Sequence, residues 1–135
     1  MKFEFSDSLL LTSICNTEGY GKGAQLKDII AYADVVNHCM ITWNEVSNGL
    51  VKLKNAKLVD VIDKKVYVKD SFNEWWLKRF ENKKRIYLLK QVNDVNIYLN
   101  KTYLAIENHK NENQIGLTEK DYQKAIDEYT AMLRK

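Results

Sequence analysis

The sequence contains no proline and few residues of the kinds that carry catalytic or metal chemistry, with two cysteines and two histidines among its 135 residues. Because no proline interrupts an amide ladder, the composition favours a helix-rich chain. No apolar run approaches the ~18 residues that cross a bilayer, and the chain does not open on a basic segment followed by an apolar core. We therefore expect a cytoplasmic protein without membrane insertion.

The few cysteines and histidines do not form a recognisable site. Cys15 and Cys39 lack a CxxC spacing, and we expect them to be reduced, buried thiols. Together with His38 they number three, whereas a structural zinc site needs four ligands, usually with paired spacings. Neither GxSxG nor HExxH occurs, and the GYGKG segment lacks the GK[ST] ending of a phosphate-binding loop. The sequence predicts no enzyme, no catalytic residue, no metal and no cofactor.

Arginine is absent before Arg79, and the net charge of +3 is spread unevenly. Residues 1–41 carry three lysines against five acids, and residues 42–70 carry six lysines against four acids. Residues 71–135 carry twelve basic residues against nine acids. This weak basic bias permits a nucleic-acid partner without requiring one. With 45% hydrophobic and 29% charged residues, the composition is that of a single globular domain.

The first half of the chain shows three stretches of helical periodicity. A first helix is expected to begin near Ser6 or Asp7, since either residue can cap it. A second is expected over 25–37, where apolar residues recur at spacings of three and four. Thr42 and Glu45 have the spacing of a capping box, so a third helix is expected to begin there and to end near residue 57.

The apolar period then changes from that of a helix to that of a strand. Two short β-branched runs, 58–62 and 65–69, flank an Asp63-Lys64 turn and predict a β-hairpin. Helix, turn, capped helix and hairpin in this order are what a winged helix-turn-helix module requires.

The second half is expected to be helical. Ser71 and Glu74 form another capping-box pattern and predict a helix directly after the hairpin. Over 86–106 a helix is favoured, with a strand pair as the alternative, because part of the apolar pattern also alternates. A last helix is expected to be capped by Thr118, with Asp121 following. The predicted fold class is mainly α with a small β-hairpin (α+β), built as a module over 1–70 and a helical extension over 71–135, packed as one globular unit.

The stretch from Leu26 to Val68, LKDIIAYADVVNHCMITWNEVSNGLVKLKNAKLVDVIDKKVYV, resembles the core of the winged helix-turn-helix superfamily. The pieces LKDIIAYAD, VNH and TWNEVSNGLVKLKNAKLV also resemble small bacterial proteins of unassigned function. The resemblance implies that the third helix is a recognition helix and that residues 58–69 are a wing. It implies no single activity, because the superfamily includes transcription regulators and domains that bind no nucleic acid.

The third helix and the wing supply the candidate site for double-stranded DNA. At 100° per residue, the helix side opposite Val46 and Leu50 is expected to be exposed; asparagine there could pair with adenine, and a valine methyl could contact thymine. Lysines at the wing tip would contact phosphate, although Asp60 and Asp63 offset their field. The missing arginine favours the alternative, a polar face that is only solvated. The candidate DNA-binding residues are Asn44, Ser47, Asn48, Val51, Lys52, Asn55, Lys64 and Lys65.

The densest basic run, from Lys78 to Lys90, is interleaved with aromatic residues. Three interpretations are open: a patch on the DNA backbone, an amphipathic helix on a membrane surface, or a helix that packs its aromatics into the core with lysine stems along its sides. The last is the commonest arrangement and is favoured.

A short apolar seam predicts a homodimer. Leu88, Val92, Val95 and Leu99 recur at spacings of four, three and four, apart from the aromatic stripe, so a second copy or the closing helix must cover them. The sequence thus predicts a homodimeric, DNA-binding transcription regulator. The alternative is a winged helix that serves as a protein-interaction scaffold and binds no DNA.

Overall fold

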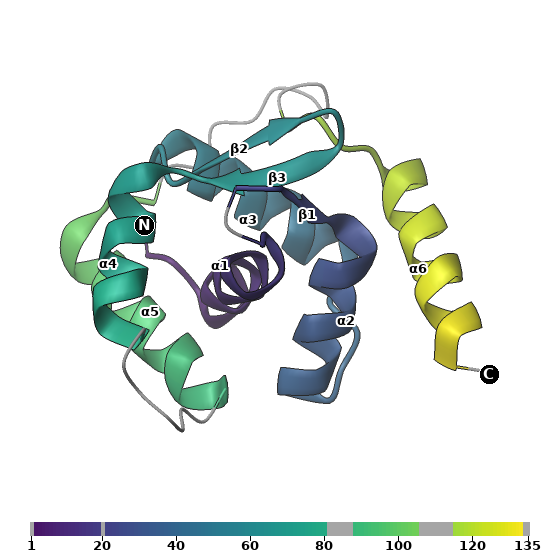
Figure 1. Ribbon diagram of the computed structural model, residues 1–135, viewed down its shortest axis with the longest axis horizontal. Helices are drawn as coiled ribbons and strands as arrows, with labels where there is room; N and C mark the ends of the chain where they lie inside the picture. Colours follow the sequence, from purple (N-terminus) through teal and green to yellow (C-terminus); the bar gives the residue numbers. More distant parts are fainter. Residues whose placement is uncertain (1, 20, 81–87, 106–114, 134–135) are drawn as a thin grey trace.

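The structure is a computed structural model in which residues 2–19, 21–80, 88–105 and 115–133 are described. It is mainly helical with one small three-stranded antiparallel sheet, which confirms the predicted fold class (Figure 1). The elements in chain order are α1 (Phe5–Thr17), β1 (Ala24–Gln25), α2 (Leu26–Asn37), α3 (Trp43–Asn55), β2 (Val59–Ile62), β3 (Lys65–Val68), α4 (Asp70–Phe80), α5 (Leu88–Thr102) and α6 (Glu119–Leu133).

Helix α1 lies at the centre of the molecule, against α2, α3 and α5 (Figure 1). Its residues from Asp7 to Ile14 are all buried. The buried hydroxyls of Thr12 and Ser13 donate to backbone carbonyls one turn earlier, at 2.7 Å each, so they enter the core with partners. The helix begins at Phe5, earlier than predicted, because Glu4 is the capping residue and Asp7 accepts its backbone amide.

Helices α2 and α3 follow the sequence prediction closely. The predicted capping box starts α3: Glu45 N–H donates to Thr42 Oγ1 at 3.1 Å, and Thr42 N–H donates to Glu45 Oε1 at 2.9 Å. The inward stripes of both helices join the core, with Ile29, Ile30 and Val46 fully buried.

The predicted hairpin is present, with β2 and β3 joined at Asp63-Lys64. Both turn residues have positive φ, 51° and 64°, as a two-residue hairpin loop of type I′ requires. A third strand, β1, was not predicted: Ala24 pairs with Val66 and Gln25 with Lys65, which places β3 at the centre of the sheet. Two residues are too few to show an alternating pattern.

Helix α4 begins at Asp70, so the predicted cap at Ser71 is wrong. The chain passes from β3 into the helix almost without a connection, and the carbonyl of Lys69 already accepts from Asn73 N–H at 3.0 Å. Ser71 is therefore a residue of the first helical turn. After α4, residues 88–102 form the helix α5, so the strand-pair alternative is excluded for these residues.

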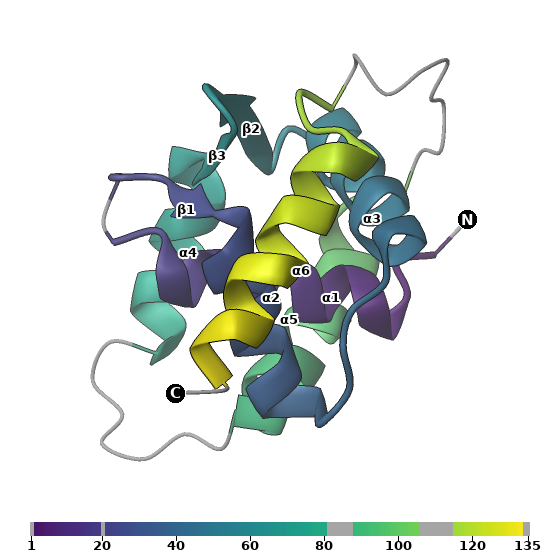
Figure 2. The ribbon, with the colours of Figure 1, turned by 90° about the vertical axis from the view of Figure 1, so that its right-hand side faces the viewer.

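The predicted seam is buried within one chain. Val92, Val95 and Leu99 on α5 are each 0% exposed, and α5 packs mainly against α1. Helix α6, which the sequence offered as the competing cover, lies instead along α2 (Figure 2). The seam is thus not an interface for a second copy, because α1 already covers it. Leu88, at the first turn of α5, remains 36% exposed.

In the described part of the chain, no helix combines the length and the apolar character that spanning a membrane requires.

Candidate functional site

The outer face of α3 presents a row of small polar side chains. Asn44, Asn48 and Asn55 are exposed, and Ser47 is half-buried beside them. The capping box at Thr42 fixes the start of this helix. Four of the residues predicted for the site therefore share one accessible face.

Two predicted site residues are not accessible. Val51 and Lys52 are only 6% and 3% exposed, so the prediction that they face solvent is wrong. At 100° per residue Val51 falls on the same side of α3 as Asn44 and Asn55, but it belongs to the hydrophobic core. Lys52 has a buried acidic partner.

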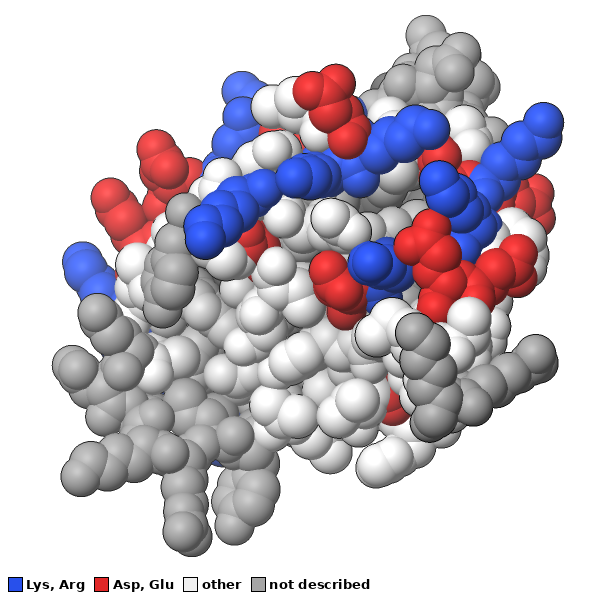
Figure 3. Space-filling model, turned by 45° about the vertical axis from the view of Figure 1, so that its right-hand side comes forward, with Lys and Arg blue, Asp and Glu red and all other residues white. Residues whose placement is uncertain are grey.

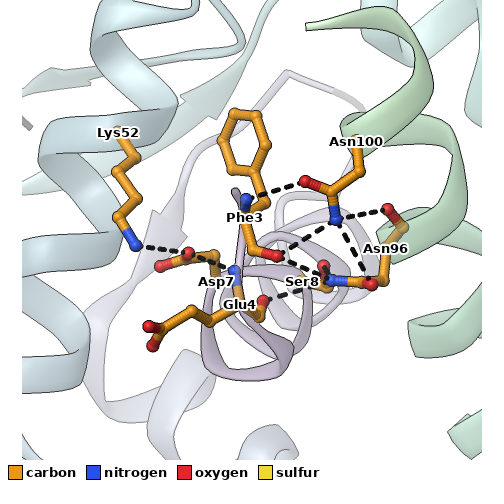
Figure 4. A network of polar contacts seen from close by, with 7 residues as sticks. All are labelled: Phe3, Glu4, Asp7, Ser8, Lys52, Asn96 and Asn100. Atoms are coloured by element: carbon orange, nitrogen blue, oxygen red, sulfur yellow. Dashed lines mark hydrogen bonds and ion pairs between the residues drawn. The ribbon is translucent and has the colours of Figure 1, made fainter. Parts of the chain in front are cut away.

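That partner is Asp7 of α1, whose Oδ2 lies 2.9 Å from Lys52 Nζ (Figure 4). The same carboxylate accepts the backbone N–H of Glu4 at 2.7 Å. Gly49 lies above this pair, and a Cβ on it would lie 3.2 Å from Asp7 Oδ1. The ion pair therefore joins the recognition-helix candidate to the central helix at a point of close approach.

A second set of polar contacts extends the connection to α5 (Figure 4). Asn100 accepts Phe3 N–H at 2.8 Å and donates to the Phe3 carbonyl at 3.1 Å. Asn96 donates to Ser8 Oγ at 2.8 Å. The N-terminal end of α1 is thus held on one side by α3 and on the other by α5.

At the tip of the hairpin, the two predicted phosphate-contacting lysines differ in environment. Lys64 is exposed, and its Nζ lies 3.0 Å from Asp121 Oδ1 at the start of α6. Lys65 is half-buried where β3 pairs with β1. Burial raises the pKa of Asp121, but hydrogen bonds from Lys64 and Thr118 outweigh it and the pKa is lowered, so the carboxylate is charged at neutral pH.

Helix α6 was predicted as a closing helix, but its contacts with the candidate site were not. Tyr122 Oη donates to the carbonyl of Ile41 at 2.5 Å, just before α3, and its ring lies 5.9 Å from that of Trp43. Tyr129 Oη donates to Asp34 Oδ2 at 2.6 Å. This bond, with burial, raises the pKa of Tyr129. A buried tyrosine hydroxyl usually has a hydrogen-bond partner. The two tyrosines on the apolar side of the last helix were therefore the sequence signal for these contacts.

A shallow cleft of about 220 Å³ lies between the hairpin tip, the start of α2 and α6. Four amines and three carboxylates line it, so charges of both signs surround the cleft. On the face seen in Figure 3, basic and acidic side chains are likewise intermixed over the upper part, and a broad area below them carries neither. The charged residues of the cleft are Lys27, Lys64, Lys65, Lys124, Asp63, Asp121 and Glu128.

The aromatic residues of the basic run pack into the core where they are described. Trp76 and Phe80 are 8% and 7% exposed, and Trp75 stacks against Tyr98 of α5 with ring centroids 4.1 Å apart. Arg79 is paired with Asp94 of α5 at 3.1 Å. The favoured core interpretation therefore holds for α4, while Lys83, Lys84, Arg85 and Tyr87 lie outside the described residues.

Cys15, His38 and Cys39 do not come together as a ligand set. Cys15 is half-buried in α1, and burial raises the pKa of its thiol. His38 ends α2 in the left-handed conformation, and Cys39 next to it is exposed, so the prediction of a buried thiol there is wrong. Among the described residues, no three His, Cys, Asp or Glu side chains are placed to hold a metal ion.

No known protein family, curated protein or solved structure matches the chain.

Proposed function

We propose that the chain is a winged helix-turn-helix protein that binds double-stranded DNA, with α3 in the major groove and the β2–β3 hairpin against the backbone. The resemblance of residues 26–68 to that superfamily agrees with the order of elements, in which α2, the capped α3 and the hairpin follow one another.

The observation that carries the proposal is the exposed polar face of α3. Asn44 and Asn48 are one turn apart on an accessible helix whose start is capped and whose inner side is held by the Lys52–Asp7 pair. Asparagine can donate to and accept from adenine in the major groove, so this face favours A·T pairs. Lys64 at the hairpin tip would supply the contact to phosphate.

The test is a titration of duplex DNA at several salt concentrations, read by fluorescence anisotropy. Asn44→Ala and Asn48→Ala should each lower the preference for A·T-rich over G·C-rich duplexes by roughly tenfold, the worth of about 1–3 kcal/mol for a bidentate base contact. The salt dependence should stay unchanged, since neither side chain is charged. Asn93→Ala, at an exposed asparagine of α5, is the matched control and should change neither quantity.

Affinity weaker than ~1 mM for every duplex at low salt would exclude DNA binding of this kind, because non-specific binding alone is usually tighter.

One observation favours a second candidate function, a winged helix that binds another protein. Two of the three lysines predicted to meet DNA are already paired, Lys52 with Asp7 in the core and Lys64 with Asp121 on α6. The remaining face is neutral and polar, which suits a protein partner as well as a base edge. The same titration separates the two, because a protein-binding face would show no salt-dependent association with DNA.

A further inference from the structure

Helix α6 contacts the proposed DNA-binding module at three separate places. At its start, Asp121 reaches Lys64 of the hairpin tip. One residue later, Tyr122 is bonded to the connection between α2 and α3. Further along, Tyr129 and Glu128 reach Asp34 and Lys27 of α2. Figure 2 shows α6 lying across α2 on this side of the molecule.

The charges on α6 complement the module beneath it. The helix carries four acids against two lysines. Its Asp121 lies 3.0 Å from Lys64, and its Glu128 lies 3.9 Å from Lys27 near the start of α2. A hairpin tip and the N-terminal end of a helix are positions that suit phosphate oxygens. In this structure, carboxylate oxygens of the same chain lie against both lysines.

We propose that α6 is an intramolecular inhibitor: it leaves Asn44 and Asn48 exposed, but it covers α2 and pairs with Lys64 of the hairpin tip, and it must leave both before a duplex can bind across α3 and the hairpin. This inference rests on the proposed DNA-binding function. Duplex DNA and α6 then compete for Lys27 and Lys64 and for the space beside the start of α3. With competition of this kind, the apparent dissociation constant for DNA equals the intrinsic constant divided by the fraction of molecules in which α6 is released.

The way in which α6 is attached suits displacement. Only Ala125 and Tyr129 of this helix are buried, and Met132 and Leu133 near its end are 56% and 62% exposed. The central α1, by contrast, is buried from Asp7 to Ile14 between its neighbours. Elements with few buried apolar contacts open at lower cost than the core. Release of α6 should therefore leave the packing of α1, α3 and α5 in place.

The first test opens the α2–α6 contact with one substitution. Ala125→Glu puts a carboxylate at a buried position on α6, and Ala131→Glu adds the same charge at an exposed position of the same helix. Ala125→Glu should bind a random duplex about tenfold more tightly than the wild type, within the range usual for coupled sites. Ala131→Glu should not bind more tightly. The added negative charge alone would weaken both variants, so a gain in affinity can only come from release.

The second test holds α6 closed without disturbing its packing. Lys27→Cys with Glu128→Cys, in a Cys39→Ser background, places two thiols where the wild-type side chains meet. A reducible bis-maleimide joins them. The tethered protein should bind the duplex at least about tenfold more weakly than the same protein after reduction of the linker. Both forms carry identical substitutions, so the comparison also decides the matter if circular dichroism shows Ala125→Glu to be unfolded.

The outcomes separate this inference from the proposed function. If tethered and reduced proteins bind DNA equally well, α6 is no inhibitor, and DNA binding stands. If neither form binds and no folded variant binds, the proposed function fails and the inference fails with it.

Discussion

At the scale of single residues, the buried Lys52–Asp7 pair was the feature that could least be predicted from the sequence. Lysine is rarely buried, and a helical wheel placed Lys52 at the edge of the exposed face. Asp7 lies 45 positions before Lys52 in the chain, so no local sequence spacing predicts the contact. Asn44 and Asn48, whose exposure depends only on the geometry of α3 and on its capping box, could be placed from the sequence.

The pair predicts a large loss of stability when one partner is removed. Lys52→Met should lower the free energy of unfolding by roughly 3–5 kcal/mol, because it leaves the Asp7 carboxylate buried without its cation. Urea denaturation measures the change. The double variant Lys52→Met with Asp7→Asn should lose less than Lys52→Met alone, since no charge is then left unpaired. Lys57→Met, at an exposed position, should stay within about 0.5 kcal/mol of the wild type. Equal stability of Lys52→Met and Lys57→Met would show that Lys52 is not buried against Asp7.

At the scale of elements, signals that lie within a few residues of one another could be interpreted from the sequence. The capping boxes at Thr42 and Thr118 and the turn at Asp63-Lys64 are of this kind, and the structure has all three. The two-residue β1 and the start of α4 at Asp70 were missed. Both depend on how β3 lies against its neighbours in space, and the sequence near them carries no sign of it.

The close approach of α3 to α1 predicts that replacing Gly49 of α3 lowers the stability of the protein. A Cβ on Gly49 would lie 2.7 Å from Leu10 Cδ2, and Leu10 is fully buried. Alanine would favour the helix by about 1 kcal/mol, but overpacking typically costs roughly 1–3 kcal/mol. Gly49→Ala should therefore destabilise the protein in urea denaturation.

Two further variants test that explanation. Asn48→Ala, one residue earlier and exposed, should leave stability unchanged or raise it slightly, because only the helix propensity acts there. Leu10→Val shortens the branch that the new Cβ would meet, so its cost should be smaller in the Gly49→Ala background than in the wild type. A Gly49→Ala protein more stable than the wild type would mean that α1 and α3 lie further apart.

At the scale of the whole molecule, the sequence showed an apolar seam on α5, but it did not show what covers that seam. The answer is α1, which is buried on all sides and also carries Ser8, Thr12 and Ser13 into the core. A helix that is buried in this way has no clear polar face, so its hydrophobic pattern does not indicate which helices pack against it. The same limit applied to α6, whose contacts with α2 and the hairpin tip join residues far apart in the chain.

The position of α1 predicts what happens when the seam is charged. Val92 is 0% exposed, so Val92→Asp would bury a carboxylate at a cost of several kcal/mol. That cost approaches the whole stability of a typical domain, about 5–15 kcal/mol. Val92→Asp should therefore unfold the protein, as seen by loss of helical circular dichroism. Ile97→Asp, on the same helix but 66% exposed, should remain folded with the wild-type mass in light scattering. If Val92→Asp instead turned a wild-type dimer into a folded monomer, the seam would be an interface between copies and α1 would not cover it. Because α1 covers the seam, Val92→Asp cannot form a folded monomer. The loss of helical circular dichroism should therefore appear at every protein concentration.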